Sequence, residues 1–94
     1  MRVKNINGTS QSVCSCGSWL QHWRNFSNQQ ATICRALSCG RNDLVGAHVQ
    51  KDVSYDNSWY IVPFCNGHNH ASGSVELVAG TVLVSANKKL TCEA

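Results

Sequence analysis

The sequence of 94 residues holds six cysteines and four histidines, and two pairs of them are spaced as metal ligands. Four residues separate Cys34 from Cys39, and two residues separate Cys65 from His68. Zinc prefers thiolate and imidazole ligands, and three cysteines with one histidine form an established structural set. Four protein ligands leave no open position for a substrate, so an ion bound here contributes folding free energy. The spacing therefore predicts a structural Zn²⁺ site. The alternative is that these cysteines are small buried apolar side chains and that His68 is a surface residue.

The remaining thiols, Cys14, Cys16 and Cys92, form a second candidate zinc site that lacks a fourth ligand. His22 and His70 are both available for that position. Three alternatives stay open at this point. Cys92 can form a disulfide with Cys14 or with Cys16, all three thiols can be free, or Cys14 and Cys16 can displace a ligand of the first site.

Whether the cysteines bind metal or form disulfides depends on the redox state of the compartment. The first twelve residues contain no apolar segment of the kind found in secretory signal peptides, so we expect a cytoplasmic location. Thiols stay reduced in the cytoplasm, which favours metal sites. The rival interpretation is a secreted mini-protein stapled by three disulfides, and the sequons at Asn7-Gly8-Thr9 and Asn25-Phe26-Ser27 fit it.

Composition limits the other classes of function. The chain is 43% hydrophobic and short enough for one domain, and no apolar run reaches the 18 or so residues that a membrane span requires. A net charge of +3 and a pI near 8.6 are too low for a strongly basic nucleic-acid binder. Some basic side chains can still contact phosphates, although a solvated surface explains them equally well. They are Arg35, Arg41, Lys51, Lys88 and Lys89.

An amphipathic helix is predicted over residues 19–27. Ser18 is a typical N-cap residue, and Gln21 three positions later completes a capping box. We expect the apolar face to contain Trp19, Leu20, Trp23 and Phe26, and His22, Arg24 and Asn25 to face solvent.

The rest of the chain has the alternation typical of strands. Short strands are predicted over residues 2–6 and 44–50, over 59–62 with an end at Pro63, and as a C-terminal hairpin with arms at 74–79 and 81–86. A short helix or turn follows Phe64. We expect Trp59, Tyr60 and Phe64 to lie in the core, although aromatic side chains can also stack on bases.

Residues 31–72 resemble a known family. A pair of cysteines precedes a strand that carries His48, an aromatic-aliphatic strand ends in Pro63-Phe64-Cys65, and Cys65-Asn66-Gly67-His68-Asn69 follows. This order resembles the zinc-stabilised HNH endonucleases, which have the treble-clef or ββα-metal fold. The resemblance implies one small α+β zinc-bound domain over 1–94. Its parts would be a polar lead-in (1–13), the helix (18–27), a treble-clef core (31–72), and a hairpin and tail (74–92).

The resemblance also implies catalytic roles. His48 would be the general base, Asn57 would orient it, and Asn69 or His70 would help hold a catalytic Mg²⁺ or Mn²⁺. However, Ala47 stands where many active members of the family have an acidic metal ligand. We therefore expect a zinc-stabilised module that binds a macromolecular partner, either protein or nucleic acid, without catalysis. A metal-dependent DNA endonuclease is the alternative.

Overall fold

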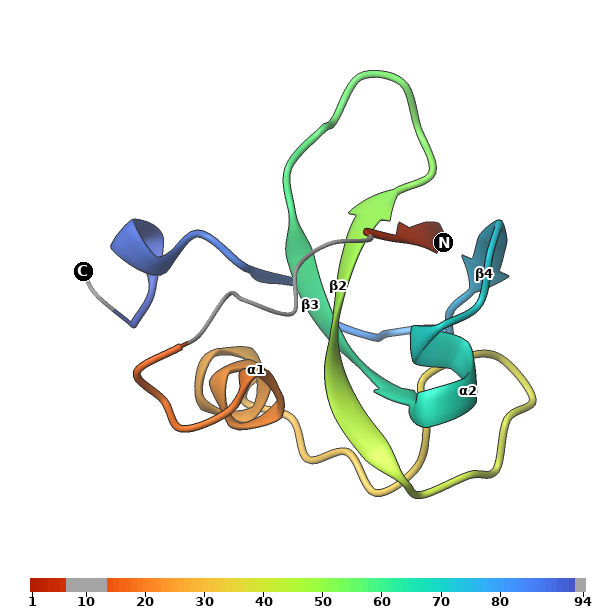
Figure 1. Cartoon of the computed structure of the whole chain (residues 1–94), viewed down its shortest axis with the longest axis horizontal. Helices are drawn as coiled ribbons and strands as arrows, with labels where there is room; N and C mark the ends of the chain where they lie inside the picture. Colours follow the sequence, from red (N-terminus) through yellow and green to blue (C-terminus); the bar gives the residue numbers. More distant parts are fainter. Residues whose placement is uncertain (7–13, 93–94) are drawn as a thin grey trace.

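A computed structural model describes residues 1–6 and 14–92 of the chain. It is a small α+β domain built on an antiparallel five-stranded sheet with the order β4-β1-β2-β3-β5 (Figure 1). The strands are β1 (Arg2–Asn5), β2 (Leu44–Lys51), β3 (Tyr60–Cys65), β4 (Ser74–Glu76) and β5 (Val84–Ser85). The helices are α1 (Trp19–Ser27), α2 (Asn66–Asn69) and a short 3-10 helix, η1 (Lys88–Leu90).

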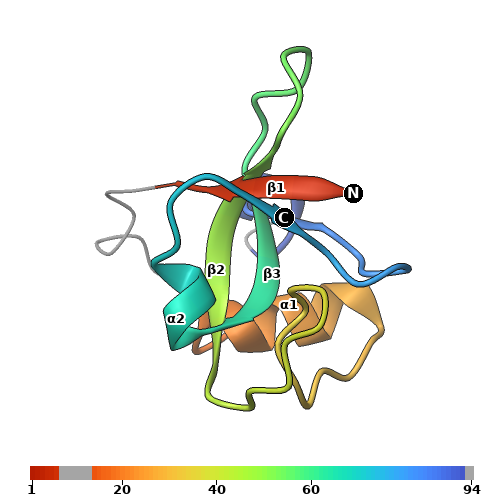
Figure 2. The ribbon, with the colours of Figure 1, turned by 90° about the vertical axis from the view of Figure 1, so that its right-hand side faces the viewer.

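The two central strands, β2 and β3, divide the core between the two faces of the sheet. One core lies on the face where Val49 and Phe64 are fully buried, together with Val3 of β1. On the other face, Ile61 packs against Trp23 of α1. Successive strand residues point to opposite faces, so His48 lies on the α1 side. Figure 2 shows α1 and α2 as separate helices, with α2 directly after β3.

The predicted helix and its N-cap are confirmed. Helix α1 spans Trp19–Ser27, and the Ser18 hydroxyl accepts a hydrogen bond from the Gln21 amide at 3.0 Å. The assignment of its faces is partly wrong, because His22 is fully buried and Phe26 is exposed. The main chain of the first turn lies directly on Gly46 of β2, where a side chain would collide with backbone atoms of Trp19.

The predicted end of a strand at Pro63 is wrong. Strand β3 continues through Pro63 to Cys65, and Pro63 is paired with Gly46. The Pro63 carbonyl accepts a hydrogen bond from the Arg35 amide at 3.0 Å, on the side away from β2. The nitrogen of the same residue faces that side as well. No ladder hydrogen bond is therefore lost, which is the condition under which strands accept proline.

The predicted C-terminal hairpin is also wrong. β4 pairs with β1 and β5 pairs with β3, so the two strands lie at opposite edges of the sheet. The apolar residues of this segment pack into two different cores. Leu77 is buried with Val3 on one face, whereas Val84 is buried with Trp23 on the other. Alternation predicted two strands here, which are shorter than the predicted arms at 74–79 and 81–86, and it carried no information about their partners.

The connection between β2 and β3 projects from the domain (Figures 1 and 2). Tyr55 in this connection is 86% exposed, and Trp59 at its end is 47% exposed. The prediction of a core position is therefore wrong for Trp59, is confirmed for the fully buried Phe64, and holds in part for the half-buried Tyr60. Within residues 1–6 and 14–92, no helix has the length and apolar character needed to cross a membrane.

Candidate metal centres

The first cluster gathers its ligand atoms from three places in the fold. Cys34 and Cys39 flank a turn, Cys65 ends β3, and His68 lies in α2. The turn is closed by a hydrogen bond from the Cys39 amide to the Ala36 carbonyl at 3.1 Å, with Ser38 in the left-handed region. The thiol of Cys65 caps α2 by accepting a hydrogen bond from the His68 amide.

The distances between the four ligand atoms suit a tetrahedral ion. The Nδ1 atom of His68 lies 3.6 Å from the sulfur of Cys34 and 3.3 Å from that of Cys65. The sulfurs of Cys39 and Cys65 are 4.0 Å apart. Zinc bonds of about 2.3 Å to sulfur and 2.0–2.1 Å to nitrogen place the corners of a tetrahedron roughly 3.5–3.8 Å apart. The four predicted ligands therefore lie together in a geometry that can hold one metal ion.

Neighbouring strands fix the position of α2. The side-chain amide of Asn5 in β1 donates hydrogen bonds to the carbonyls of His68 and Ala71, at 2.7 and 3.0 Å. Asp43 accepts from the amide of Asn66 at the start of the helix. The Arg41 guanidinium beside Asp43 holds the pKa of that carboxyl down at about 2. Because Asn5 of β1 and Asp43, which directly precedes β2, hold this one-turn helix at its two ends, His68 stays in position to act as a ligand.

The thiols of this cluster differ in acidity. Burial raises the pKa of Cys34 to about 11. Burial also acts to raise the pKa of Cys65, but hydrogen bonds from the His68 amide and imidazole and from the other two thiols outweigh it and lower the pKa to about 7. A lowered pKa favours the thiolate, which is the form of cysteine that binds metal ions.

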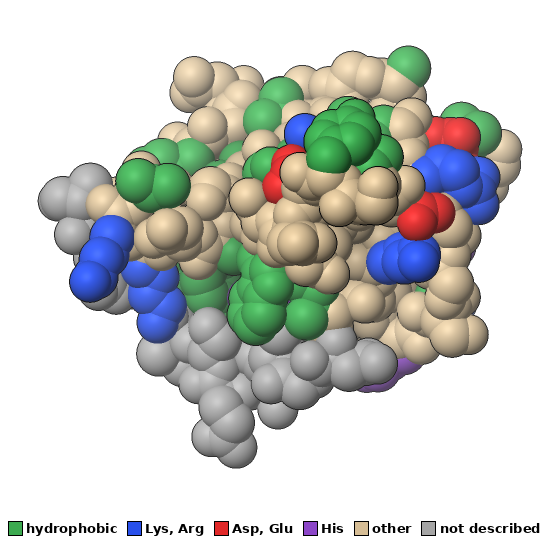
Figure 3. All heavy atoms as spheres, turned by 90° about the horizontal axis from the view of Figure 1, so that it is seen from above, with side chains coloured by type: hydrophobic (Ala, Val, Ile, Leu, Met, Phe, Trp, Pro, Cys, Tyr) green, Lys and Arg blue, Asp and Glu red, His purple; other side chains and the backbone are tan. Residues whose placement is uncertain are grey.

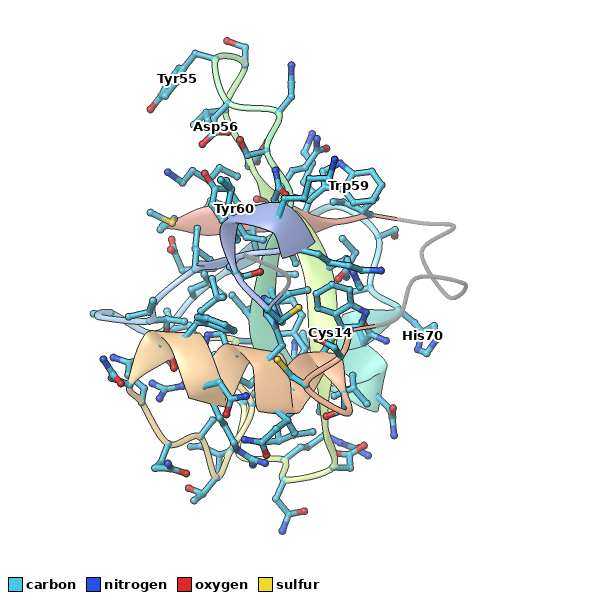
Figure 4. All side chains as sticks on the ribbon, turned by 90° about the vertical axis from the view of Figure 1, so that its left-hand side faces the viewer. Cys14, Tyr55, Asp56, Trp59, Tyr60 and His70 are labelled. Atoms are coloured by element: carbon cyan, nitrogen blue, oxygen red, sulfur yellow. The ribbon has the colours of Figure 1, made fainter. Side chains whose placement is uncertain are left out.

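A second cluster contains the other three cysteines together with His22 of α1. All ligand atoms of Cys14, Cys16, His22 and Cys92 lie within 4.8 Å of one another. Figure 4 shows Cys14 between α1 and the C-terminal segment. His70, the other histidine considered for this site, is exposed at the end of α2, where its Nδ1 lies 2.8 Å from the Asn66 carbonyl. The two clusters are thus separate sets of three cysteines and one histidine.

The disulfide alternatives are not formed. All six cysteines lie in the described residues and all six are free thiols. Cys14 and Cys92 approach each other most closely, at 3.1 Å between sulfurs, which is longer than the roughly 2.05 Å of a disulfide bond. Of the two sequons, the one at Asn7 lies outside the described residues, and Asn25 is exposed on α1.

His48, the candidate general base, lies in an aromatic environment. Its ring is 4.7 Å from the ring of Trp19 and 6.4 Å from that of Trp59, measured between centroids. Its Nε2 atom is buried and has no hydrogen-bond partner among the described residues. Burial, reinforced by the nearby His22, lowers the pKa of His48. Both effects favour the neutral form of the imidazole.

The other candidate catalytic residues lie apart from His48. Asn57 is exposed in the projecting connection, where its carbonyl accepts a hydrogen bond from the Gln50 side chain. Asn69 and His70 are at the end of α2, and Figure 4 shows His70 at the periphery of the molecule. Within residues 1–6 and 14–92, every carboxylate pairs with a basic group. These pairs are Arg2–Glu76, Lys4–Asp52, Arg41–Asp43 and Lys51–Asp56.

The assignment of His22 to the solvent face missed a signal in the sequence. Positions 19, 22, 23 and 26 are spaced i, i+3, i+4 and i+7, which is the helical stripe itself. His22 therefore lies beside Trp23 on the packed side, eight residues after Cys14 and six after Cys16. A histidine on the buried face of a helix, close to a Cys-x-Cys pair, is a recognisable ligand pattern.

Comparison of the chain with protein-family models, with curated proteins and with solved structures finds no match.

Proposed function

We propose that this chain is a non-catalytic, zinc-stabilised module that binds a protein partner. The observation that carries the proposal is the composition of the two clusters, each of which has three cysteines and one histidine within ligand distance. A tetrahedral zinc ion with four protein ligands has no open coordination position for a substrate or an activated water. The ions therefore stabilise the fold, and the binding function lies on the surface of the domain.

The first cluster supports a treble-clef arrangement over residues 31–72. The chain order is a cysteine turn, then the β2–β3 hairpin, then a helix that carries Cys65 at its N-cap and His68 in its only turn. This is the order that the resemblance to HNH proteins implies. A Cys/His cluster does not identify that superfamily by itself, so the relationship remains part of the proposal.

The proposed binding surface is the face from which the β2–β3 connection projects. A hollow of about 350 Å³ lies there, lined by Ser58, Trp59, Ser85, Ala86, Asn87 and Leu90. Trp59 is half exposed, Leu90 is 72% exposed, and Tyr55 lies near the tip of the connection (Figure 4). Figure 3 looks onto this face and shows hydrophobic side chains near its centre, with basic groups at its sides. Exposed tryptophan and tyrosine are the residues that most often dominate protein interfaces.

The distribution of charge favours an acidic polypeptide over a nucleic acid. Arg2, Lys4, Arg41 and Lys51 are already paired with carboxylates. Lys88 and Lys89 of η1, next to Leu90, have no ion pair with any residue in the described part of the chain. Two lysines neutralise few phosphates, whereas an apolar side chain flanked by Asp or Glu would fill the hollow and pair with both.

The nuclease alternative requires groups around His48 that the described residues do not supply. A general base acts when a water or substrate oxygen lies within hydrogen-bond reach. The ring of His48 has the rings of Trp19 and Trp59 as neighbours. The candidate metal ligands Asn69 and His70 lie at the end of α2. This arrangement favours a packing role for His48.

Selection of random linear peptides on the zinc-loaded chain tests the proposal. The enriched peptides should contain an apolar anchor next to Asp or Glu. Their binding should fall at least about tenfold in Trp59→Ala and in Leu90→Ala. Leu37→Ala is the matched control, because Leu37 is exposed and lies outside the hollow, and it should leave affinity unchanged. Equal binding by Trp59→Ala would refute the proposed surface.

A DNA assay tests catalysis directly. Supercoiled plasmid incubated with the protein and Mg²⁺ or Mn²⁺ should remain uncut. Cleavage that disappears in His48→Ala would instead establish the nuclease and overturn the proposal.

A further inference from the structure

We infer that Cys14, Cys16, His22 and Cys92 bind a zinc ion of their own, and that this ion holds residues 87–92 onto α1. The four side chains fit a zinc ion, and within residues 1–6 and 14–92 few other contacts hold the segment that carries Cys92.

The four ligand atoms lie within 4.8 Å of one another, and a shift of a few tenths of an ångström at Cys14 gives the roughly 3.5–3.8 Å between the corners of a tetrahedral zinc site. The Nδ1 atom of His22 is 3.0 Å from the sulfur of Cys14 and 3.8 Å from that of Cys16. The sulfurs of Cys14 and Cys92 are 3.1 Å apart. Soft thiolates with one imidazole in a tetrahedral arrangement select zinc over the hard cations Mg²⁺ and Ca²⁺.

The orientation of His22 prepares it for metal binding. Its Nε2 atom lies 2.9 Å from the main-chain oxygen of Ser85. A carbonyl oxygen only accepts hydrogen bonds, so Nε2 must carry the proton, and the lone pair of the neutral ring is then on Nδ1. That atom points at the three sulfurs. Zinc-bound histidines are usually held in this way, by a hydrogen bond from the nitrogen that does not touch the metal.

The turn that carries Cys14 and Cys16 is also shaped for a ligand pair. The amide of Cys16 donates to the sulfur of Cys14 at 3.3 Å, and the amide of Gly17 donates to the Cys14 carbonyl at 3.2 Å. Gly17 has a φ of +100°, which glycine adopts at little cost. The turn therefore brings both thiols to one side without strain.

Among the described residues, few contacts other than those of Cys92 hold residues 87–92 against the rest of the domain. The last hydrogen bond that ties this part of the main chain to the sheet runs from the Ala86 amide to the Trp59 carbonyl. From Asn87 to Thr91 the described hydrogen bonds are local, and no side chain between residues 87 and 92 is buried. Apart from the hydrogen bond of the Asn87 amide to the Ser85 hydroxyl, the described hydrogen bonds that leave the segment are those of Cys92 to Cys14 and Ser15. A metal ion shared by Cys92 and His22 would supply the missing anchor.

One consequence rests on the proposed function. Asn87 and Leu90 form part of the wall of the hollow beside Trp59. An ion that holds Cys92 also holds this wall in position. Loss of the ion should therefore weaken partner binding, but the zinc site itself is tested without any partner.

Native mass spectrometry tests the site. The wild-type chain, purified without added metal, should carry two zinc ions, and Cys92→Ser should carry one. Cys92→His restores a nitrogen ligand and should recover the second ion. His70→Ala is the matched histidine control and should retain both ions, because His70 lies outside the cluster.

Trypsin tests the anchoring, because Lys88 and Lys89 lie within the held segment. Cleavage after these lysines requires local opening of the chain. It should be at least about tenfold faster in Cys92→Ser than in the wild type or in Cys92→His. Two results would overturn the inference. One is a wild-type mass with a single zinc ion and two hydrogen atoms fewer, which indicates a Cys14–Cys92 disulfide. The other is an unchanged rate of cleavage in a Cys92→Ser chain that has lost one ion.

Discussion

The main chain of Trp19 rests directly on the α-carbon of Gly46, so that the first turn of α1 and the middle of β2 touch without an intervening side chain. A Cβ at position 46 would collide with the backbone of Trp19 and Leu20. This close approach sets the distance between the helix and the sheet, and it brings Trp19 over His48.

Gly46→Ala should therefore destabilise the protein. The helix would have to move away from β2, and overpacking of this kind costs about 1–3 kcal/mol or more. Urea unfolding followed by circular dichroism measures the change. Gly40→Ala is the matched control, since a Cβ there meets no atom within 4 Å and φ is not positive, and it should leave stability nearly unchanged. Equal stabilities of the two variants would contradict the close approach.

Trp23→Ala should cost about 3–5 kcal/mol in the free energy of unfolding. Trp23 is fully buried, packs against Ile61 and Val84, and donates its indole N–H to the Val82 carbonyl at 2.8 Å. Trp59→Ala, at a half-exposed position, should cost less than about 1 kcal/mol. Chemical denaturation of the two variants compares them, and a larger loss for Trp59→Ala would contradict the assignment of the core.

Removal of zinc from the first cluster should abolish the native fold. Structural zinc contributes on the order of 10 kcal/mol, which is comparable to the whole stability of a small domain. A strong chelator, or Cys65→Ser, should therefore remove the near-ultraviolet circular dichroism signal of the buried tryptophan. Asn66→Ser, next in the chain but outside the cluster, should preserve it. A metal-free chain that melts cooperatively at an unchanged temperature would refute the role of the ion.

His48 should make stability depend on pH in a defined direction. Burial and the neighbouring His22 lower the pKa of His48 in the folded state, whereas in the unfolded chain the ordinary value of about 6.5 applies. Between these two pKa values the unfolded chain binds more protons, so its population rises as pH falls. The contribution of neutral His48 is complete above about pH 6.5 and is lost as pH falls toward the folded pKa.

The test is the difference in pH dependence between the wild type and His48→Leu, which cannot titrate. Between about pH 7.5 and 5.5 the wild type should lose more unfolding free energy than the variant. Protonation of the zinc ligands changes the unfolding free energy of both chains, so it cancels when one curve is subtracted from the other. Parallel curves would show that His48 titrates normally in the folded protein.

Patterns local in the sequence predicted the local features of this fold. The cap at Ser18, the helix at 19–27 and the strand that carries His48 follow from capping chemistry and periodicity, and the structure contains them. The spacing within the pairs Cys34–Cys39 and Cys65–His68 marked four predicted ligands, which the structure brings together. The cap, the helix and each ligand pair require only residues a few positions apart, whereas joining the two pairs relied on the chemistry of zinc.

Features that depend on distant partners escaped the same reasoning. Whether Val84 pairs with Val75 or with Ile61 is decided by two separate cores. Pro63 is tolerated because its nitrogen faces away from β2, on the side where its carbonyl accepts from Arg35. The burial of His22 depends on Ser85 and Cys92, more than sixty residues away in the sequence. A pattern of alternating residues cannot predict contacts between residues so far apart in the sequence.

The two clusters enclose different lengths of the chain. The ligand atoms of the first come from residues between Cys34 and His68, whereas those of the second come from both sides of that span, from Cys14 to Cys92. An ion bound in the second cluster would therefore close a loop that contains every predicted ligand of the first. The entropy of closing a loop grows only slowly with its length, so the longer loop adds little cost. A chain cut before Cys92 would keep all four predicted ligands of the first cluster and lose one of the second.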